Sequence, residues 1–122
     1  MRISSEATSS LLKALSDPTR LRIVNLLTEA KLCVCSIEQV LGISQTAASR
    51  HLARLQSAGI LSSERRAQWV YYWIDQRFSR DHAPLLQYLR TAAQSDLQLV
   101  EDQRRLQRHA SDETLCMPTL GN

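Results

Sequence analysis

The feature that most constrains the fold is a glycine-centred pair of helical patterns in "SIEQVLGISQTAASRHLARLQSAG". Ser36 with Gln39 three residues later has the spacing of a capping box, so we expect a short helix that begins at Ser36 and ends at Gly42. A second helix is expected from Ser44 to Gly59, and its inward face carries small and aliphatic residues: Ala48, Leu52 and Leu55. Two helices joined by such a turn form a helix-turn-helix.

The flanking segments complete a mainly α fold with a small β-hairpin. "LLKALSD" is typical of the end of a first helix, and Asp17 followed by Pro18 predicts the start of a second. "ILSSERR" and "QWVYYWID" predict a two-stranded hairpin, since side chains in the second segment alternate with a period of two. From about Ser79 we expect one long helix that passes Arg105. Its apolar stripe is too large for a small domain to bury alone, so a partner chain is expected to cover part of it.

Composition limits the chain to one compact domain. It has 122 residues, of which 43% are hydrophobic and 22% charged, and no apolar run approaches the roughly 18 residues that span a bilayer. The N-terminal "MRISSEATSS" lacks the apolar stretch of a signal peptide, and three cysteines do not make a secreted disulfide framework. We therefore expect a cytoplasmic protein with reduced thiols and no membrane contact.

Positive charge is concentrated in the middle third of the chain, although the net charge is only +3. Between Ser44 and Arg80 six arginines stand against two acids, whereas four arginines stand against six acids from Asp81 onward. A basic stretch that includes a helix-turn-helix suits the phosphate backbone of DNA.

The second helix of the motif exposes polar side chains that can hydrogen-bond to base edges and phosphates. Because Ala48, Leu52 and Leu55 face inward, the opposite face of its N-terminal half is expected to read the major groove through Gln45, Thr46, Ser49 and Arg50. His51 fits equally a DNA contact and a partly buried structural hydrogen bond. At the hairpin tip, Arg65, Arg66 and Gln68 are expected to reach the flanking groove.

Cys33 and Cys35 stand one residue apart ahead of the motif, in "LCVC". Thiolates are soft ligands for thiophilic ions. Residues i and i+2 point to opposite faces of a strand and lie about 200° apart on a helix, so neither conformation lets both sulfurs hold one ion. Binding is therefore expected to reshape the backbone beside the helix that supports the reading helix.

The segments "DPTRLRIVNLL", "LCVC", "SRHLARLQSAGIL" and "WVYY", in this order, closely resemble the ArsR/SmtB family of winged-helix metalloregulators, and "CVC" resembles its arsenic-sensing branch. The resemblance implies a homodimeric winged helix-turn-helix repressor, dimeric through its first and last helices. Such a repressor binds an imperfect inverted repeat of operator DNA and leaves it when a toxic metal or metalloid binds. Ala67 stands where the family usually has glycine, so we expect a different turn in the wing.

The arsenic-sensing branch has a third cysteine three residues after the pair, where this chain has Glu38. Trivalent arsenic and antimony, As(III) or Sb(III), prefer three thiolates, and we expect Cys116 to complete the set. Two alternatives stay open: the pair alone binds a methylated arsenical, or Cys116 is a bystander. Cadmium or lead, or oxidation of the pair, could also be the signal.

Two other classes of site are disfavoured. A thiol redox enzyme needs a C-x-x-C helix start or a phosphate-type loop, and the chain has neither. The family's zinc-sensing pattern is not reproduced by Asp81, His82 and His109, and both histidines are expected on the surface. We expect residues 1–108 to form the DNA-binding and dimerisation domain, and residues 109–122 to form a flexible tail that carries Cys116.

Overall fold

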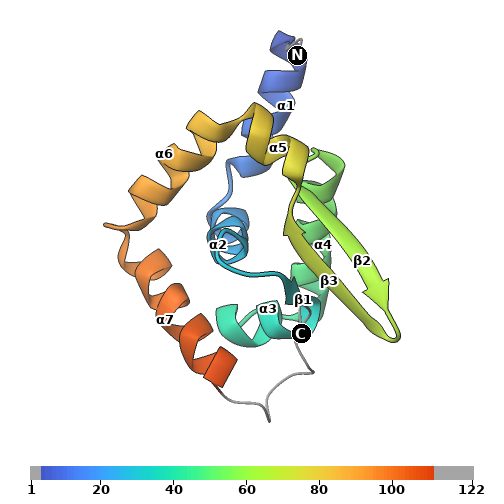
Figure 1. The fold of residues 1–122 in the computed structure, drawn as a ribbon, viewed down its shortest axis with the longest axis vertical. Helices are drawn as coiled ribbons and strands as arrows, with labels where there is room; N and C mark the ends of the chain where they lie inside the picture. The colour runs from blue at the N-terminus through green and yellow to red at the C-terminus, as the bar shows by residue number, and fades with distance from the viewer. Residues whose placement is uncertain (1–3, 112–122) are drawn as a thin grey trace.

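The computed structural model describes residues 4–111 of the chain (Figure 1). Along the described part, helices and strands follow in this order: α1 (Ser5–Leu15), α2 (Pro18–Leu27), β1 (Leu32–Cys33), α3 (Val34–Leu41), α4 (Gln45–Ser57), β2 (Leu61–Arg66), β3 (Trp69–Ile74), α5 (Gln76–Asp81), α6 (Ala83–Ala93) and α7 (Leu97–Ser111). Within residues 4–111, no helix combines the length and the hydropathy needed to cross a membrane.

Helix α2 begins where the sequence predicts. The Asp17 carboxylate accepts a hydrogen bond from the backbone N–H of Arg20 at 3.0 Å, and Pro18 occupies the first turn. That backbone hydrogen bond is the main reason why the pKa of Asp17 lies below its ordinary value. The cap fixes the direction in which α2 enters the core.

Helix α3 begins three residues earlier than predicted. Its N-cap is Cys33 and not Ser36, because the Cys33 sulfur accepts the backbone N–H of Ser36 at 3.3 Å. The prediction of a Ser36–Gln39 capping box was therefore wrong, and Ser36 lies inside the first turn. The predicted end at Gly42 is confirmed: this residue adopts a left-handed φ of 69° and donates its N–H to Glu38.

The predicted hairpin is confirmed, and a third short strand joins it. Strand order is β1-β3-β2, with both pairs antiparallel. Arg66 pairs with Trp69, so Ala67 and Gln68 form a two-residue turn. Strand β1 pairs Cys33 with Tyr71, which attaches the thiol segment directly to the wing.

The core is built around α2, which Figure 1 shows nearly end-on at the centre of the molecule. The hairpin, α3 and α4 lie on one side of it, and α6 and α7 form a V on the other. Fully buried aliphatic side chains from α2, α3, α4 and the segment before β2 fill the interior: Ile23, Val24, Leu26, Ile37, Leu52, Leu55 and Ile60. The helix-turn-helix therefore packs against α2 through a shared buried core.

The predicted single long helix is not observed, because three separate helices, α5, α6 and α7, occupy that region. The Asp75 carboxylate caps α5, and the Asp96 carboxylate accepts the Leu99 N–H at 3.0 Å in the first turn of α7. Pro84, in the first turn of α6, has no N–H to continue the preceding helix. The break before α6 therefore comes with Pro84 and the break before α7 with the Asp96 cap, and the apolar faces change direction with the chain.

Candidate DNA-reading surface and thiol site

Helix α4 presents the predicted reading surface. Gln45, Thr46, Ser49 and Arg50 are all exposed in its N-terminal half, while Ala48, Leu52 and Leu55 are fully buried. Ser44 caps the helix by accepting the Ala47 N–H at 3.1 Å. The remaining free N–H groups of this first turn face the same solvent as the polar side chains, an arrangement that suits a phosphate.

His51 makes a structural hydrogen bond. It is partly buried, and its Nδ1 lies 3.3 Å from Nη1 of Arg20. Arg20 also donates from Nε to the carbonyl of Ala14 at 2.6 Å. His51 therefore ties the reading helix to the junction of α1 and α2, as the second of its two sequence interpretations expected.

The wing tip holds the three predicted side chains in solvent. Arg65, Arg66 and Gln68 are exposed at or beside the β2–β3 turn, and Arg66 lies 3.6 Å from Glu64 in an exposed ion pair. Ala67 adopts a left-handed φ of 55°, a conformation that normally favours glycine. The turn thus stays tight without glycine.

Cys33 and Cys35 differ in environment. Cys33 is only 2% exposed, and its sulfur meets both the N–H and the Oγ of Ser36, each at 3.3 Å. Cys35, one residue into α3, is partly exposed, and Nε2 of Gln39 lies 3.7 Å from its sulfur. Cys35 is disulfide-bonded in this structure, so the expectation of two reduced thiols holds for Cys33 and not for Cys35. Cys116, the third predicted ligand, lies outside the described residues. The structure therefore shows two of the three predicted sulfurs at the strand-to-helix junction.

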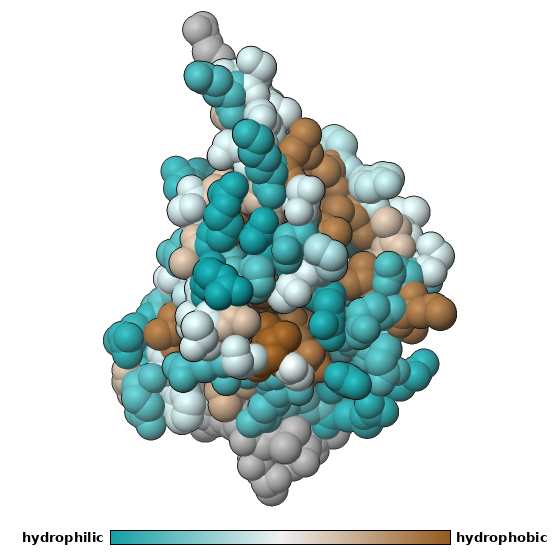
Figure 2. Space-filling model, turned by 180° about the vertical axis from the view of Figure 1, so that it is seen from behind, coloured by the Kyte–Doolittle hydropathy of each residue, from teal (hydrophilic) through white to brown (hydrophobic). Residues whose placement is uncertain are grey.

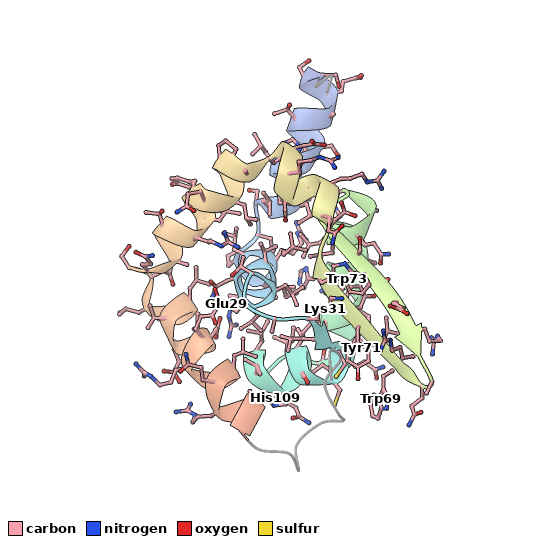
Figure 3. The ribbon with its side chains drawn as sticks, viewed as in Figure 1. Glu29, Lys31, Trp69, Tyr71, Trp73 and His109 are labelled. Carbon is pink, nitrogen blue, oxygen red and sulfur yellow. The ribbon has the colours of Figure 1, made fainter. Side chains whose placement is uncertain are left out.

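An aromatic row runs along β3 next to this junction. Figure 3 shows Trp69, Tyr71 and Trp73 following one another on the strand, and the Lys31 ammonium lies 4.6 Å from the centre of the Trp73 ring. Burial raises the pKa of Tyr71, and negative charge on Cys33, its cross-strand partner, raises it further. The tyrosine hydroxyl thus stays protonated beside the thiol.

His109 is the residue at this site that sequence reasoning missed. It was expected on the surface, but it is partly buried, and its Nε2 lies 2.9 Å from Oγ of Ser36. Figure 3 shows it at the end of α7, against α3. No spacing pattern could have found this contact, because Ser36 and His109 lie 73 positions apart in the sequence.

A buried ion pair fixes α7 on α2. Asp102 is fully buried and accepts two hydrogen bonds from Arg22, at 2.8 and 3.0 Å, and one from Gln98 at 2.9 Å. Arg22 also donates to the carbonyl of Leu41 at 3.2 Å. The hydrogen bond to Asp102 raises the pKa of Arg22. Because a buried charge is costly without its partner, α7 can leave α2 only with a large loss of stability.

The fold and these surfaces define a winged helix-turn-helix protein. The family model "Bacterial regulatory protein, arsR family" matches residues 17–63. The chain is 46% identical over 72 residues to the arsenic resistance transcriptional regulator ArsR1 of Pseudomonas putida, covering 52% of this chain and 56% of that protein. It is 48% identical over 63 residues to the arsenical resistance operon repressor of Escherichia coli, covering 51% and 54%.

Solved structures agree. Reduced HlyU from Vibrio cholerae has 33% sequence identity and a TM-score of 0.61, covering 70% of this chain and 90% of that one. A homodimeric winged helix-turn-helix DNA-binding domain from Mycobacterium bovis has 29% identity and a TM-score of 0.64, covering 73% and 80%.

This chain belongs to the arsR family of bacterial regulatory proteins. The sequence-based assignment to this family and to the winged helix-turn-helix fold is confirmed. The chain spans about half the length of the curated relatives that it matches. Those relatives are transcriptional regulators, not enzymes, which agrees with the low weight given to a thiol redox enzyme.

Proposed function

We propose that the protein is a homodimeric transcriptional repressor that binds an inverted repeat of operator DNA and leaves it when trivalent arsenic or antimony binds Cys33, Cys35 and Cys116. It would act in the cytoplasm, where DNA and reduced thiols occur together. The arsenic-resistance regulators among its relatives support the class of inducer.

The DNA contacts divide between two elements. Exposed polar side chains of α4 would read base edges and phosphates in the major groove, and the arginines of the β2–β3 wing would bind the flanking backbone. Much of the affinity would come from phosphates, so it should fall steeply with salt. Two copies related by a twofold axis would place their α4 helices on successive turns of the duplex, so the operator should be an inverted repeat.

A second copy of the chain is supported by apolar side chains left in solvent. Leu97 is 88% exposed, Tyr88 67% and Leu12 50%, on α7, α6 and α1 respectively. Figure 2 shows hydrophobic surface on the side of the molecule where α6 and α7 lie. Exposed apolar surface of this kind marks an association site, and the homodimeric relative from Mycobacterium bovis has the same fold.

The observation that carries the thiol proposal is the contact between His109 and Ser36. At 2.9 Å it brings the last turn of α7 against the first turn of α3, beside Cys33. Cys116 lies seven positions after His109 in the sequence, and an extended segment of that length spans at most about 25 Å. In the reduced protein, Cys116 would therefore be able to reach Cys33 and Cys35 of its own chain. With three sulfurs in reach, the chain has the donor set that trivalent arsenic prefers.

The test is a titration of DNA release under reducing conditions with arsenite, antimonite, methylarsenite, cadmium and zinc. The probe is a duplex that the wild-type protein selects from random-sequence DNA. We expect release by arsenite and antimonite, and we expect Cys33→Ser, Cys35→Ser and Cys116→Ser each to abolish it while DNA binding persists. A Cys116→Ser protein that still responds to arsenite would remove Cys116 from the site. If methylarsenite alone releases that variant, Cys33 and Cys35 suffice for a methylated arsenical, whose methyl group takes the place of the third sulfur.

A further inference from the structure

Helix α7 is hydrogen-bonded to α3 at both ends of the shorter helix. At the start of α3, Nε2 of His109 lies 2.9 Å from Oγ of Ser36. At its end, Nη1 of Arg105 donates to the carbonyl of Val40 at 3.5 Å. The two contacts lie one turn apart on α7, so the C-terminal half of α7 lies along α3. A change in the first turn of α3 therefore alters a contact with α7.

The contact at the start of α3 continues to the thiol. The hydroxyl that meets His109 also lies 3.3 Å from the Cys33 sulfur, and the backbone N–H of the same serine donates to that sulfur. Cys33, Ser36 and His109 thus form a continuous hydrogen-bonded chain between the thiol segment and α7. Ser36 is only 5% exposed, so water has little access to replace either contact.

An ion bound by Cys33 would compete with this chain. A bound thiophilic ion takes electron density from the Cys33 sulfur and so weakens the hydrogen bond that this sulfur accepts from the N–H of Ser36. Gripping one ion together with Cys35 also requires the sulfurs to turn toward each other, away from a helix-cap geometry. Once the sulfur turns, the Ser36 hydroxyl loses one partner and becomes free to rotate away from His109.

We propose that the Cys33–Ser36–His109 chain is a latch that holds the C-terminal end of α7 on α3, and that inducer binding opens it. This inference rests on the proposed function for the identity of the inducer. The closed latch is the DNA-binding state. His109 is a positioning residue that acts through Ser36 without touching the inducer.

Opening of the latch can affect the reading helix α4 through the contacts of α7 with α2. Helix α7 is held on α2 by Arg22 and by Asn25, whose side-chain amide donates to the carbonyl of Leu99 at 3.2 Å. Arg20, two residues before Arg22 on α2, is hydrogen-bonded to His51 of α4. A shift of α7 therefore reaches the DNA-reading helix through α2, without passing through the thiol segment itself.

The test compares His109→Ala, Ser36→Ala and the double variant with wild type, using the selected duplex and no inducer. We expect each variant to lower DNA affinity at least about fivefold, the lower end of typical allosteric couplings. The double variant should lose no more than the larger single loss, since both changes open one latch. His109→Gln keeps a hydrogen-bonding group near the position of Nε2 and should restore affinity. Arg104→Ala is the matched control and should change nothing: it lies on the same helix, and within residues 4–111 its side chain bonds only to Glu101.

Hydrogen exchange distinguishes a latch from a purely structural role of His109, because only a latch responds to arsenite. Amides of residues 105–111 should exchange faster in wild type after arsenite is added, and equally fast in His109→Ala before it is added. Arsenite should then cause little further release of the variant from DNA. Wild-type affinity and wild-type exchange in His109→Ala would overturn the latch. If arsenite fails to act on wild type, the proposed inducer fails, while the measurements without inducer still decide the latch.

Discussion

At the scale of a single residue, Ala67 shows how strain is placed at the tip of the wing. Its φ of 55° lies in a region where the alanine Cβ crowds the following carbonyl, at a cost of about 1–2 kcal/mol. The pairing of Arg66 with Trp69 on either side leaves only two residues for the turn. The strand register therefore imposes the conformation, although the side chain opposes it.

Ala67→Gly should raise the free energy of unfolding by about 0.5–1 kcal/mol. Glycine removes the Cβ crowding, and its greater freedom in the unfolded chain offsets part of that gain. Urea unfolding at one fixed protein concentration measures the change.

The matched control is Ala53→Gly on the exposed side of α4, where the backbone is helical. It should lower stability by about 1 kcal/mol, because glycine is a poor helix former. Equal destabilisation by both substitutions would show that residue 67 carries no strain.

Residue-scale prediction from sequence succeeded where a signal is local. The exposed positions of α4 followed from its inward-facing Ala48 and Leu52 alone. The N-cap of α3 did not, because both Cys33 and Ser36 are acceptable cap residues and only the β1–β3 pairing decides between them. His109 could not be assigned either, since its role depends on how α7 folds back across the chain.

At the scale of elements, sequence patterns likewise failed to predict where the expected long helix breaks. Apolar periodicity continues through α5, α6 and α7. It correctly predicted that this region is helical, and wrongly predicted that it forms one continuous helix. Pro84 has no N–H with which to continue α5 into α6, and Asp96 accepts the Leu99 N–H at the start of α7. Periodicity reports which face is buried, whereas caps report where the axis turns.

The α5 cap predicts a pH dependence of stability. Asp75 accepts hydrogen bonds from the Ser62 hydroxyl at 2.6 Å and from the N–H groups of Arg77 and Phe78, and the Ser62 bond is the main cause of its lowered pKa. A carboxyl whose folded pKa is depressed stabilises the protein above its unfolded pKa of about 3.9, and the stabilisation is lost as the pH falls through the folded value.

Asp75→Asn should therefore be less stable than wild type at pH 7, and the difference should shrink between about pH 4 and the folded pKa. Urea unfolding at several pH values measures it. In a Ser62→Ala background the pH-dependent part should be smaller, because the main stabilising hydrogen bond is gone. A difference that stays constant down to pH 3 would contradict the assignment.

At the scale of the whole molecule, the V of α6 and α7 leaves apolar side chains outside the core that encloses α2. Leu97, the first residue of α7, is the most exposed of them at 88%. Burial of a leucine side chain contributes about 1.5–3 kcal/mol, so two copies in a symmetric interface would be a large share of its stability.

Leu97→Glu should weaken the dimer at least tenfold, as measured by sedimentation equilibrium. The substitution places an acidic side chain in the first turn of α7, where the helix dipole favours it, so the fold of each protomer should be preserved. Gln94→Glu, at the C-cap of α6, adds the same charge three residues away without removing an apolar group, and it should leave association nearly unchanged. Equal dissociation constants for the Leu97→Glu and wild-type proteins would place the interface elsewhere.

Strand β1 is two residues long, and its second residue also caps α3. The segment that would grip the inducer is therefore joined by backbone to the wing through Tyr71 and to the helix-turn-helix through α3. The two elements that are proposed to contact DNA, α4 and the wing, are therefore both attached to this segment. Under the proposed function, a displacement of this segment would move α4 and the wing together, so we expect release from DNA in one step, with no half-bound state.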